Sequence, residues 1–254
     1  MKPLHFGEPG KELFGVYHRP KGRTIRSTAV VVCYPSPQEY MFAHWSLGKL
    51  SQLLARQGFH VLRFDYYATG DSEGASSEGT LDQWREDIKT AITELKDLSG
   101  ASKVAAVGMR LGASLAAEVS ATANVLADLV LWDPIVRGAP YVSELYEVQR
   151  SQTFESPDDE LLGFPFPAAL RQATERLNLL ELGPCRVDRA RLFVSEARPE
   201  YESLRAHLAE QGTKVDLEVV SEAATQTKGR KLDESMLAQA IPQAIAAALV
   251  SRGA

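Results

Sequence analysis

The sequence predicts an α/β protein with a mostly parallel central sheet and helices on both faces. Short apolar segments alternate along the chain with amphipathic segments of about a dozen residues, a pattern typical of β-α-β crossovers. Several of the apolar segments, such as TAVVVCYPS (28–36), are continuous rather than alternating, as expected for strands buried on both faces. With 254 residues, of which 44% are hydrophobic, the chain is long enough to bury one sizeable core. We therefore expect a single domain over residues 1–254.

The first half of the chain is expected to start the alternation. Gly58 and the Ser-Gly pair at 99–100 follow two helical patterns and are typical helix ends. The strand from residue 59 runs into a turn rich in Gly, Asp and Ser. The expected strands are 12–20, 28–36, 59–74 with its turn, and 103–108, and the expected helices are 46–58, 81–100 and 111–123.

The second half continues the pattern after an interruption. Strands are expected at 127–134, 189–197 and 214–223, with helices at 201–212 and 236–252. Pro242 predicts a kink or a break of the last helix near Ile241. Residues 137–187 break the alternation with Pro/Gly clusters and helical pieces, and they are interpreted as a cap inserted between strands. The core would then comprise residues 1–136 and 188–254.

Composition excludes several classes of partner. The net charge of −5 and the isoelectric point near 5.6 lack the basic footprint of a nucleic-acid binder. No secretory signal and no apolar run long enough to span a bilayer are recognised. Cys33 is expected to be a buried thiol, and Cys185 lies too far along the chain to suggest a disulfide framework. We expect a cytoplasmic protein without a metal site or cofactor.

Four linked segments carry a family resemblance. VLRFDYYATGDSEG (61–74) is followed by VGMRLGAS (107–114), a strand, a Gly-x-X-x-Gly turn and a helix start. In this order they resemble the α/β-hydrolase fold over nearly the whole chain. CYPSPQEYMFAH (33–44), GMRLGASLA (108–116) and VLWDPIVRGAPYVSEL (130–145) are more narrowly similar to hydrolase-like proteins that accompany exosortase and some biosynthetic gene clusters.

The resemblance implies a catalytic site whose parts are missing here. The tip of the turn between Gly108 and Gly112 carries the nucleophile in such hydrolases, but here it is Arg110, which has no free lone pair. The catalytic histidine is expected within 221–235, where none exists, and His207 falls in the helix 201–212. The acid is expected after strand 189–197, where Glu196 and Glu200 are the candidates. We interpret the turn as a degenerate nucleophile elbow.

Arg110 needs a negative partner at the start of helix 111–123. A cation at a helix N-terminus is disfavoured by roughly 0.3–1 kcal/mol, and burying it unpaired costs several kcal/mol more. An internal ion pair with Glu39, in the expected loop 35–45, or with Asp133 is favoured over an external carboxylate, phosphate or thioester oxyanion. The candidate ligand-contact residues are Gln38, Glu39, His44, Arg110, Leu111 and Asp133.

Three functions remain open. We favour a non-catalytic homologue that binds a small acidic or acyl ligand, or a partner protein, in a cleft near Arg110. The alternative is an active hydrolase or acyl transferase, esterase- or thioesterase-like, with rearranged machinery such as Ser36 with His44 or a carboxylate-activated water. The third is a scaffold role, as a homodimer for example. Fold alone does not choose among them.

Overall fold

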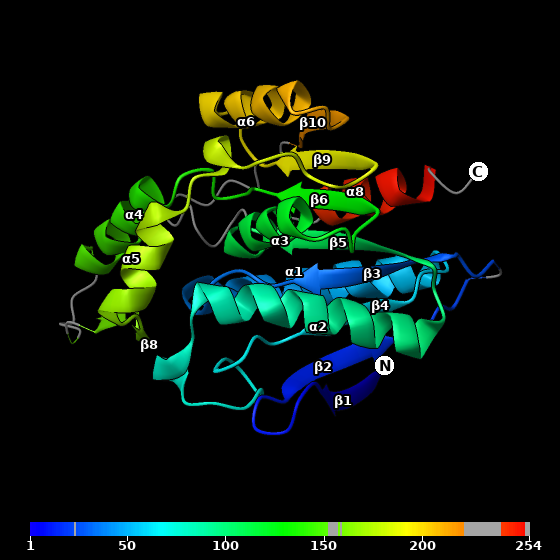
Figure 1. Cartoon of the computed structure of the whole chain (residues 1–254), viewed down its shortest axis with the longest axis horizontal. Helices are drawn as coiled ribbons and strands as arrows, with labels where there is room; N and C mark the ends of the chain where they lie inside the picture. The colour runs from blue at the N-terminus through cyan, green and yellow to red at the C-terminus, as the bar shows by residue number, and fades with distance from the viewer. Residues whose placement is uncertain (23, 152–156, 158, 221–239, 252–254) are drawn as a thin grey trace.

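The computed structural model describes residues 1–22, 24–151, 157, 159–220 and 240–251. Eight strands form one sheet in the order β1-β2-β4-β3-β5-β6-β9-β10 (Figure 1). The β1–β2 and β2–β4 pairs are antiparallel and every other pair is parallel, which confirms the mostly parallel sheet. The strands are β1 (Lys2–Phe6), β2 (Leu13–His18), β3 (Thr28–Cys33), β4 (Val61–Phe64), β5 (Lys103–Met109), β6 (Asp128–Trp132), β9 (Arg189–Val194) and β10 (Val215–Val219).

Helices cover both faces of the sheet, as expected. In Figure 1, α2 and α3 lie in front of the strands and contact each other, whereas α1 and α8 lie behind them and also contact each other. The helices are α1 (Pro37–Arg56), α2 (Leu81–Ser99), α3 (Leu111–Thr122), α4 (Gly138–Arg150), α5 (Ala168–Arg176), α6 (Pro199–Glu210) and α8 (Ala240–Val250), with 3-10 turns η1 (Ser76–Glu78) and η2 (Leu179–Glu181).

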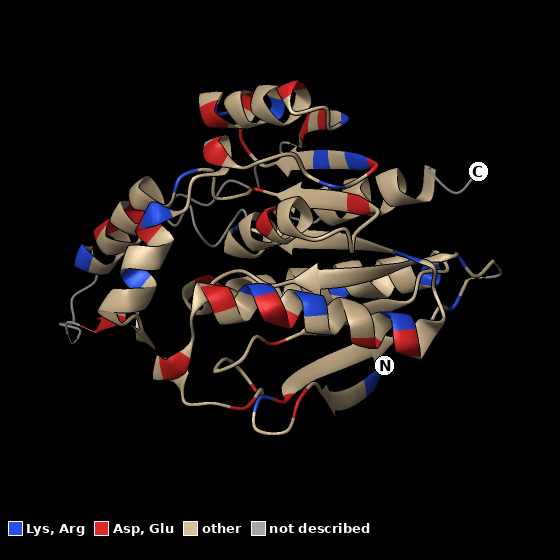
Figure 2. Ribbon diagram, viewed as in Figure 1, with Lys and Arg blue, Asp and Glu red and all other residues tan. Residues whose placement is uncertain are grey.

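Covering both faces explains the continuous apolar strands. Residues 29–33 of β3 are completely buried, because helices pack on both sides of this central strand. In Figure 2, acidic and basic residues lie along the helices, and few lie on the central strands. The core is therefore built from the sheet and the inner faces of the helices.

Two expectations about the N-terminal half are wrong. Helix α1 begins at Pro37 rather than at residue 46, so the stretch 37–45 is helical and not a loop. Proline suits the first turn of a helix, where its missing N–H costs nothing, and Glu39 in that turn complements the helix dipole. The edge strand β1 was not expected, since its partly exposed residues lack the apolar pattern of the inner strands.

Part of the predicted cap 137–187, namely α4, α5 and a short hairpin, lies beyond one end of the strands. Helices α4 and α5 contact each other and lie with the short hairpin of β7 (Glu160–Leu161) and β8 (Phe164–Pro165) at the left of Figure 1. Contacts of α5 with α2 and of β8 with η1 join this part of the chain to the core. That it acts as a cap stays a prediction.

The C-terminal expectations are only partly testable. Residues 221–235, and the expected helix start at 236–239, lie outside the described residues. The described helix α8 begins at Ala240, so a kink or break near Ile241 relative to the preceding residues stays a prediction.

Candidate functional site

The turn between β5 and α3 is held by two close backbone approaches. A Cβ added at Gly112 would lie 2.1 Å from the Tyr34 carbonyl oxygen, and one at Gly108 would lie 2.5 Å from Cα of Ala113. Between them, Arg110 has φ +52° and ψ −121°, a conformation that side-chain-bearing residues rarely adopt. Both glycines are therefore required for the tight turn that carries Arg110.

Arg110 forms the internal ion pair predicted from the sequence. Its Nε donates to Oε1 of Glu39 at 2.8 Å, and Glu39 projects from the first turn of α1. Glu39 is completely buried, whereas the Arg110 side chain is 13% exposed. Arg110 Nη2 lies a further 4.0 Å from the half-exposed carboxylate of Glu144. The positive charge of the Arg110 guanidinium is therefore balanced by a buried carboxylate of the same chain.

Tyr141 and Ser36 complete the surroundings of the Glu39 carboxylate. The Tyr141 hydroxyl donates to Oε2 of Glu39 at 2.8 Å, and the Ser36 hydroxyl lies 2.8 Å from the Tyr141 oxygen and donates to Glu39 Oε2 at 3.3 Å. The Arg110 guanidinium carbon lies 5.3 Å from the centre of the Tyr141 ring, within cation–π range. We call Ser36, Glu39, Arg110 and Tyr141 the buried polar cluster.

Protonation states in the cluster follow from burial and pairing. Burial, and next the Glu39 charge, raise the pKa of Tyr141 well above its usual value, so this phenol stays a hydrogen-bond donor. Burial would lower the pKa of Arg110, but the charge of Glu39 and the hydrogen bond to it outweigh burial, and the pKa is raised. The guanidinium therefore remains charged at every working pH.

Asp133 follows β6 at the same edge of the sheet but is not the ion-pair partner of Arg110. Its Oδ1 accepts a hydrogen bond from the Ser195 backbone N–H at 2.8 Å, and its own N–H donates to the Phe193 carbonyl. Burial raises the pKa of the Asp133 carboxyl, although the Ser195 N–H and the nearby Arg110 charge act against this. Asp133 thus ties β6 to the turn after β9.

Ser36 and His44 are not brought together. Eight residues separate them, and at 1.5 Å per helical residue this is about 12 Å along α1. His44 is exposed, and its Nδ1 lies 2.8 Å from the Met41 carbonyl oxygen. Its ring stacks on Tyr40. The structure therefore gives Ser36 and His44 different partners.

The acid and base candidates after the turn also face elsewhere. The Glu196 side chain is 71% exposed and pairs with Arg198 at 3.5 Å, and Glu200 lies 3.9 Å from the same residue. Nε2 of His207, on α6, lies 2.8 Å from the Leu182 carbonyl oxygen. None of the three has a recorded contact with the buried polar cluster.

Gln38 and Leu111 are both buried, and Gln38 has an unusual feature. Its side-chain oxygen and nitrogen are inaccessible and have no hydrogen-bond partner among the described residues, although buried amides are normally paired. Cys33 is free and buried, as expected, Cys185 is also free and buried, and burial raises the pKa of Cys33 to about 12. A thiol in this state is a poor nucleophile.

An aromatic pocket adjoins the buried polar cluster. It has a volume of about 160 Å³ and lies between the start of α1, the turn after β4 and the β7–β8 hairpin. Pro35 and Pro37, which flank Ser36, form part of its wall. The other lining residues are Tyr34, Tyr40, Asp65, Tyr66, Ala68, Thr69, Gly70, Ser76, Phe164 and Pro165. We call this site the aromatic pocket.

Sequence reasoning missed both Tyr141 and this pocket. Tyr141 stands in the quoted motif VLWDPIVRGAPYVSEL, but nothing in the motif shows that α4 folds back onto Glu39. The three tyrosines of the pocket come from separate segments and have no common spacing. Among the described residues there is no group of side chains suited to a metal ion, and no helix long and apolar enough to cross a bilayer.

Comparison with known proteins defines the fold class. No family model matches the chain. A 67-residue stretch, 26% of this chain, is 33% identical to the human mitochondrial palmitoyl-protein thioesterase ABHD10, and the match spans only 22% of the length of that relative. The α/β hydrolase domain-containing protein 10 from mouse superposes with a TM-score of 0.62 at 17% identity, over 99% of this chain and 98% of that one. Est1E from Butyrivibrio proteoclasticus with bound ferulic acid gives 0.67 at 15% identity, over 98% and 97%.

These likenesses establish that the chain has the α/β-hydrolase fold. In particular, its structural neighbours include an esterase and a thioesterase-related protein, and the fold is shared across the whole chain.

Proposed function

We propose that this protein is a non-catalytic α/β-hydrolase-fold protein that binds a small acyl or aromatic ligand beside Arg110. The observation that carries the proposal is the ion pair of Arg110, at the tip of the β5–α3 turn, with the buried Glu39. In a serine hydrolase of this fold the tip presents an attacking oxygen. A guanidinium has no lone pair for attack.

Rearranged chemistry at Ser36 has little physical support. Among the described residues, the carboxylate hydrogen-bonded to its hydroxyl is that of Glu39, at 3.3 Å. Glu39 already holds an ion pair with Arg110 through Oε1 and accepts a hydrogen bond from Tyr141 at Oε2, so both of its oxygens are engaged. The same contacts argue against a water molecule activated by Glu39.

The aromatic pocket indicates the ligand class. A cavity of about 150 Å³ lined by apolar side chains can hold benzene, and this pocket of about 160 Å³ can hold an aromatic ring or a short acyl chain. Its polar groups are already engaged: Tyr40 donates to Asp65, and Tyr66 donates to the Tyr34 carbonyl. Because the Asp65 carboxyl lines the wall, a neutral group is favoured there over a carboxylate.

The test is binding of a matched neutral and anionic pair, methyl ferulate and ferulate, measured by isothermal titration. We expect methyl ferulate to bind and Phe164→Ala to weaken it about tenfold, because Phe164 is a half-buried part of the pocket wall. Phe42→Ala, a change of the same kind outside the pocket lining, should leave binding unchanged. Absence of binding by both compounds would contradict the proposed ligand class.

An acyl hydrolase is the second candidate, because the similar proteins include a thioesterase and an esterase. Labelling the purified protein with a fluorophosphonate distinguishes the two functions. We expect no labelling, with an active serine hydrolase as the positive control. Labelling that disappears in Ser36→Ala would establish the alternative. The association with exosortase systems, the cytoplasmic location and a protein partner or homodimer remain parts of this proposal.

A further inference from the structure

A second pocket lies at the opposite end of the strands from Arg110. It is lined by the last residue of β2, His18, and by the last turns of α1, including Gln52 and Arg56. His18 is in register with Val61, the first residue of β4, whereas Arg110 follows the carboxyl end of β5. The pocket has a volume of about 430 Å³, within the range of small-molecule sites. It is therefore a site separate from the aromatic pocket.

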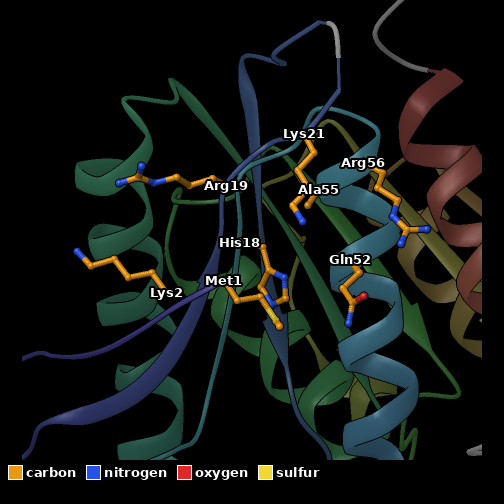
Figure 3. Close-up of a pocket in the computed structure, with 8 residues that line it drawn as sticks. All are labelled: Met1, Lys2, His18, Arg19, Lys21, Gln52, Ala55 and Arg56. Atoms are coloured by element: carbon orange, nitrogen blue, oxygen red, sulfur yellow. The ribbon is translucent and has the colours of Figure 1, made fainter.

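The lining of this pocket is rich in positive charge. Lys2, Arg19, Lys21 and Arg56 contribute to it, and none of the described residues that line it is an aspartate or a glutamate. Figure 3 shows Lys21 and Gln52 on the same side as the His18 ring, while Lys2 and Arg19 extend to the other side of the strand. Lys2 is within electrostatic reach of Glu94 on α2. On the side of the strand that carries the His18 ring, Lys21 is therefore the lining cation nearest that ring, and Figure 3 shows the Arg56 guanidinium on α1 extending away from it.

The end of α1 does not cancel this charge. A helix C-terminus presents carbonyl oxygens that repel anions. Here the carbonyl of Ala55 accepts from the backbone N–H groups of Lys21 and Gly58, and the carbonyls of Leu53 and Leu54 accept from Gln57. These carbonyl groups are thus occupied by backbone donors.

His18 provides a buried, oriented donor in the same wall. It is only 3% exposed, and its Nε2 lies 3.3 Å from Nε of Arg63, which can only donate. Nε2 is therefore the acceptor, and the ring proton of the neutral imidazole must be on Nδ1. Burial, and then the charges of Arg63, the N-terminal amino group and Lys21, lower the pKa of His18 to about 4, so the ring is neutral at pH 7.

We infer that this pocket is a binding site for a small phosphate monoester, held by Lys21 with His18 and Gln52 as neutral donors, while Arg56 adds positive charge at the rim. All four side chains present hydrogen-bond donors, and a phosphate group offers several acceptor oxygens and negative charge. The pocket volume leaves room for an organic group beyond the phosphate. Unlike the proposed aromatic ligand, this one would be selected by charge.

The experiment is a titration of the full-length protein with glycerol 3-phosphate at pH 7, with sodium chloride at matched ionic strength as the salt control. Binding is followed by calorimetry and by the NMR signals of the His18 ring. We expect saturable binding, and a bound dianion should raise the pKa of His18 because it stabilises the imidazolium form. Lys21→Ala should weaken binding about tenfold, as expected for loss of a charge-assisted contact, and Arg56→Ala should weaken it less because Arg56 lies at the rim.

Lys214→Ala is the matched control. Lys214 is an exposed lysine just before β10, which is the edge strand on the side of the sheet away from β1 and β2. It should leave the affinity unchanged. The site would be disproved by an absence of binding above the salt control, or by equal losses in Lys21→Ala and Lys214→Ala. Because Lys21 and Arg56 are exposed, their variants should fold, and the readout does not depend on the aromatic pocket.

Discussion

The Arg110 guanidinium and the Glu39 carboxylate lie 2.8 Å apart although 71 residues separate them in the chain. The ion pair joins the turn after β5 to the first turn of α1, and Tyr141 connects it to α4. Three segments thus meet through one buried carboxylate. This arrangement makes the pair a structural element that links distant parts of the chain.

Removing Arg110 should be more damaging than removing the charge of Glu39. Arg110→Met leaves a completely buried carboxylate without a counter-charge, which costs roughly 3–5 kcal/mol. In Glu39→Gln, Arg110 remains 13% exposed and close to Glu144, so we expect a smaller cost of about 1–3 kcal/mol. Urea unfolding of both variants measures the difference.

The double variant provides the control for this asymmetry. Arg110→Met with Glu39→Gln removes both charges, so its loss of unfolding free energy should be smaller than the sum of the two single losses. Additive losses would mean that the two side chains do not stabilise each other.

Adding a methyl group at a glycine of the β5–α3 turn should destabilise the folded protein. Gly112→Ala would place a Cβ 2.1 Å from the Tyr34 carbonyl oxygen, so β3 and α3 would have to separate. We expect a loss of several kcal/mol in unfolding free energy. Gly48→Ala is the matched control: it lies within α1 with nothing inside 4 Å, and it should stabilise the helix by about 0.5–1 kcal/mol.

Restoring a hydroxyl at the tip of the turn should not restore catalysis. In Arg110→Ser the serine would lack a histidine base, because 221–235 contains none and His207 contacts the Leu182 carbonyl. Hydrolysis of p-nitrophenyl butyrate should stay at the background rate. A clear gain of activity would show that another base operates near the turn.

The stability of the protein should depend on pH through Asp87. Burial raises the pKa of this carboxyl from 3.8 to about 6, so the folded state holds a proton that the unfolded state has already lost. This contribution is complete below pH 3.8 and is lost as the pH rises through 6, a change of about 3 kcal/mol at most. Asp87→Asn should abolish it, and urea unfolding at pH 4, 5.5 and 7 measures the difference.

The unfolding free energy of the unchanged protein must be compared with that of Asp87→Asn at each pH, because His18 changes the stability with pH in the opposite direction. Its pKa is lowered from 6.5 to about 4, so the stability that it contributes is lost as the pH falls through this window. The advantage of Asp87→Asn over the unchanged protein should grow from pH 4 to pH 7. A constant difference would mean that Asp87 has a normal pKa in the folded state.

Local patterns were sufficient to predict most of the fold. Continuous β-branched segments such as 29–33 predict strands buried on both faces, and the glycines around Arg110 predict a tight turn; the structure contains both. The predictions failed where an element depends on its neighbours. Strand β1 is partly exposed and pairs only with β2, and the first turns of α1 carry Glu39, a charged residue buried by contacts from elsewhere.

The sequence alone also established that the tip of the turn carries a permanent charge and that no histidine exists in 221–235, because residue identity settles both points. It left two internal partners for Arg110 open. Only the tertiary structure placed Glu39 against the guanidinium and Asp133 against the Ser195 N–H, and only it brought Tyr141 onto the same carboxylate. The physical reason is that side-chain pairing depends on how segments distant in the chain pack together, and spacing along the chain carries no information about that.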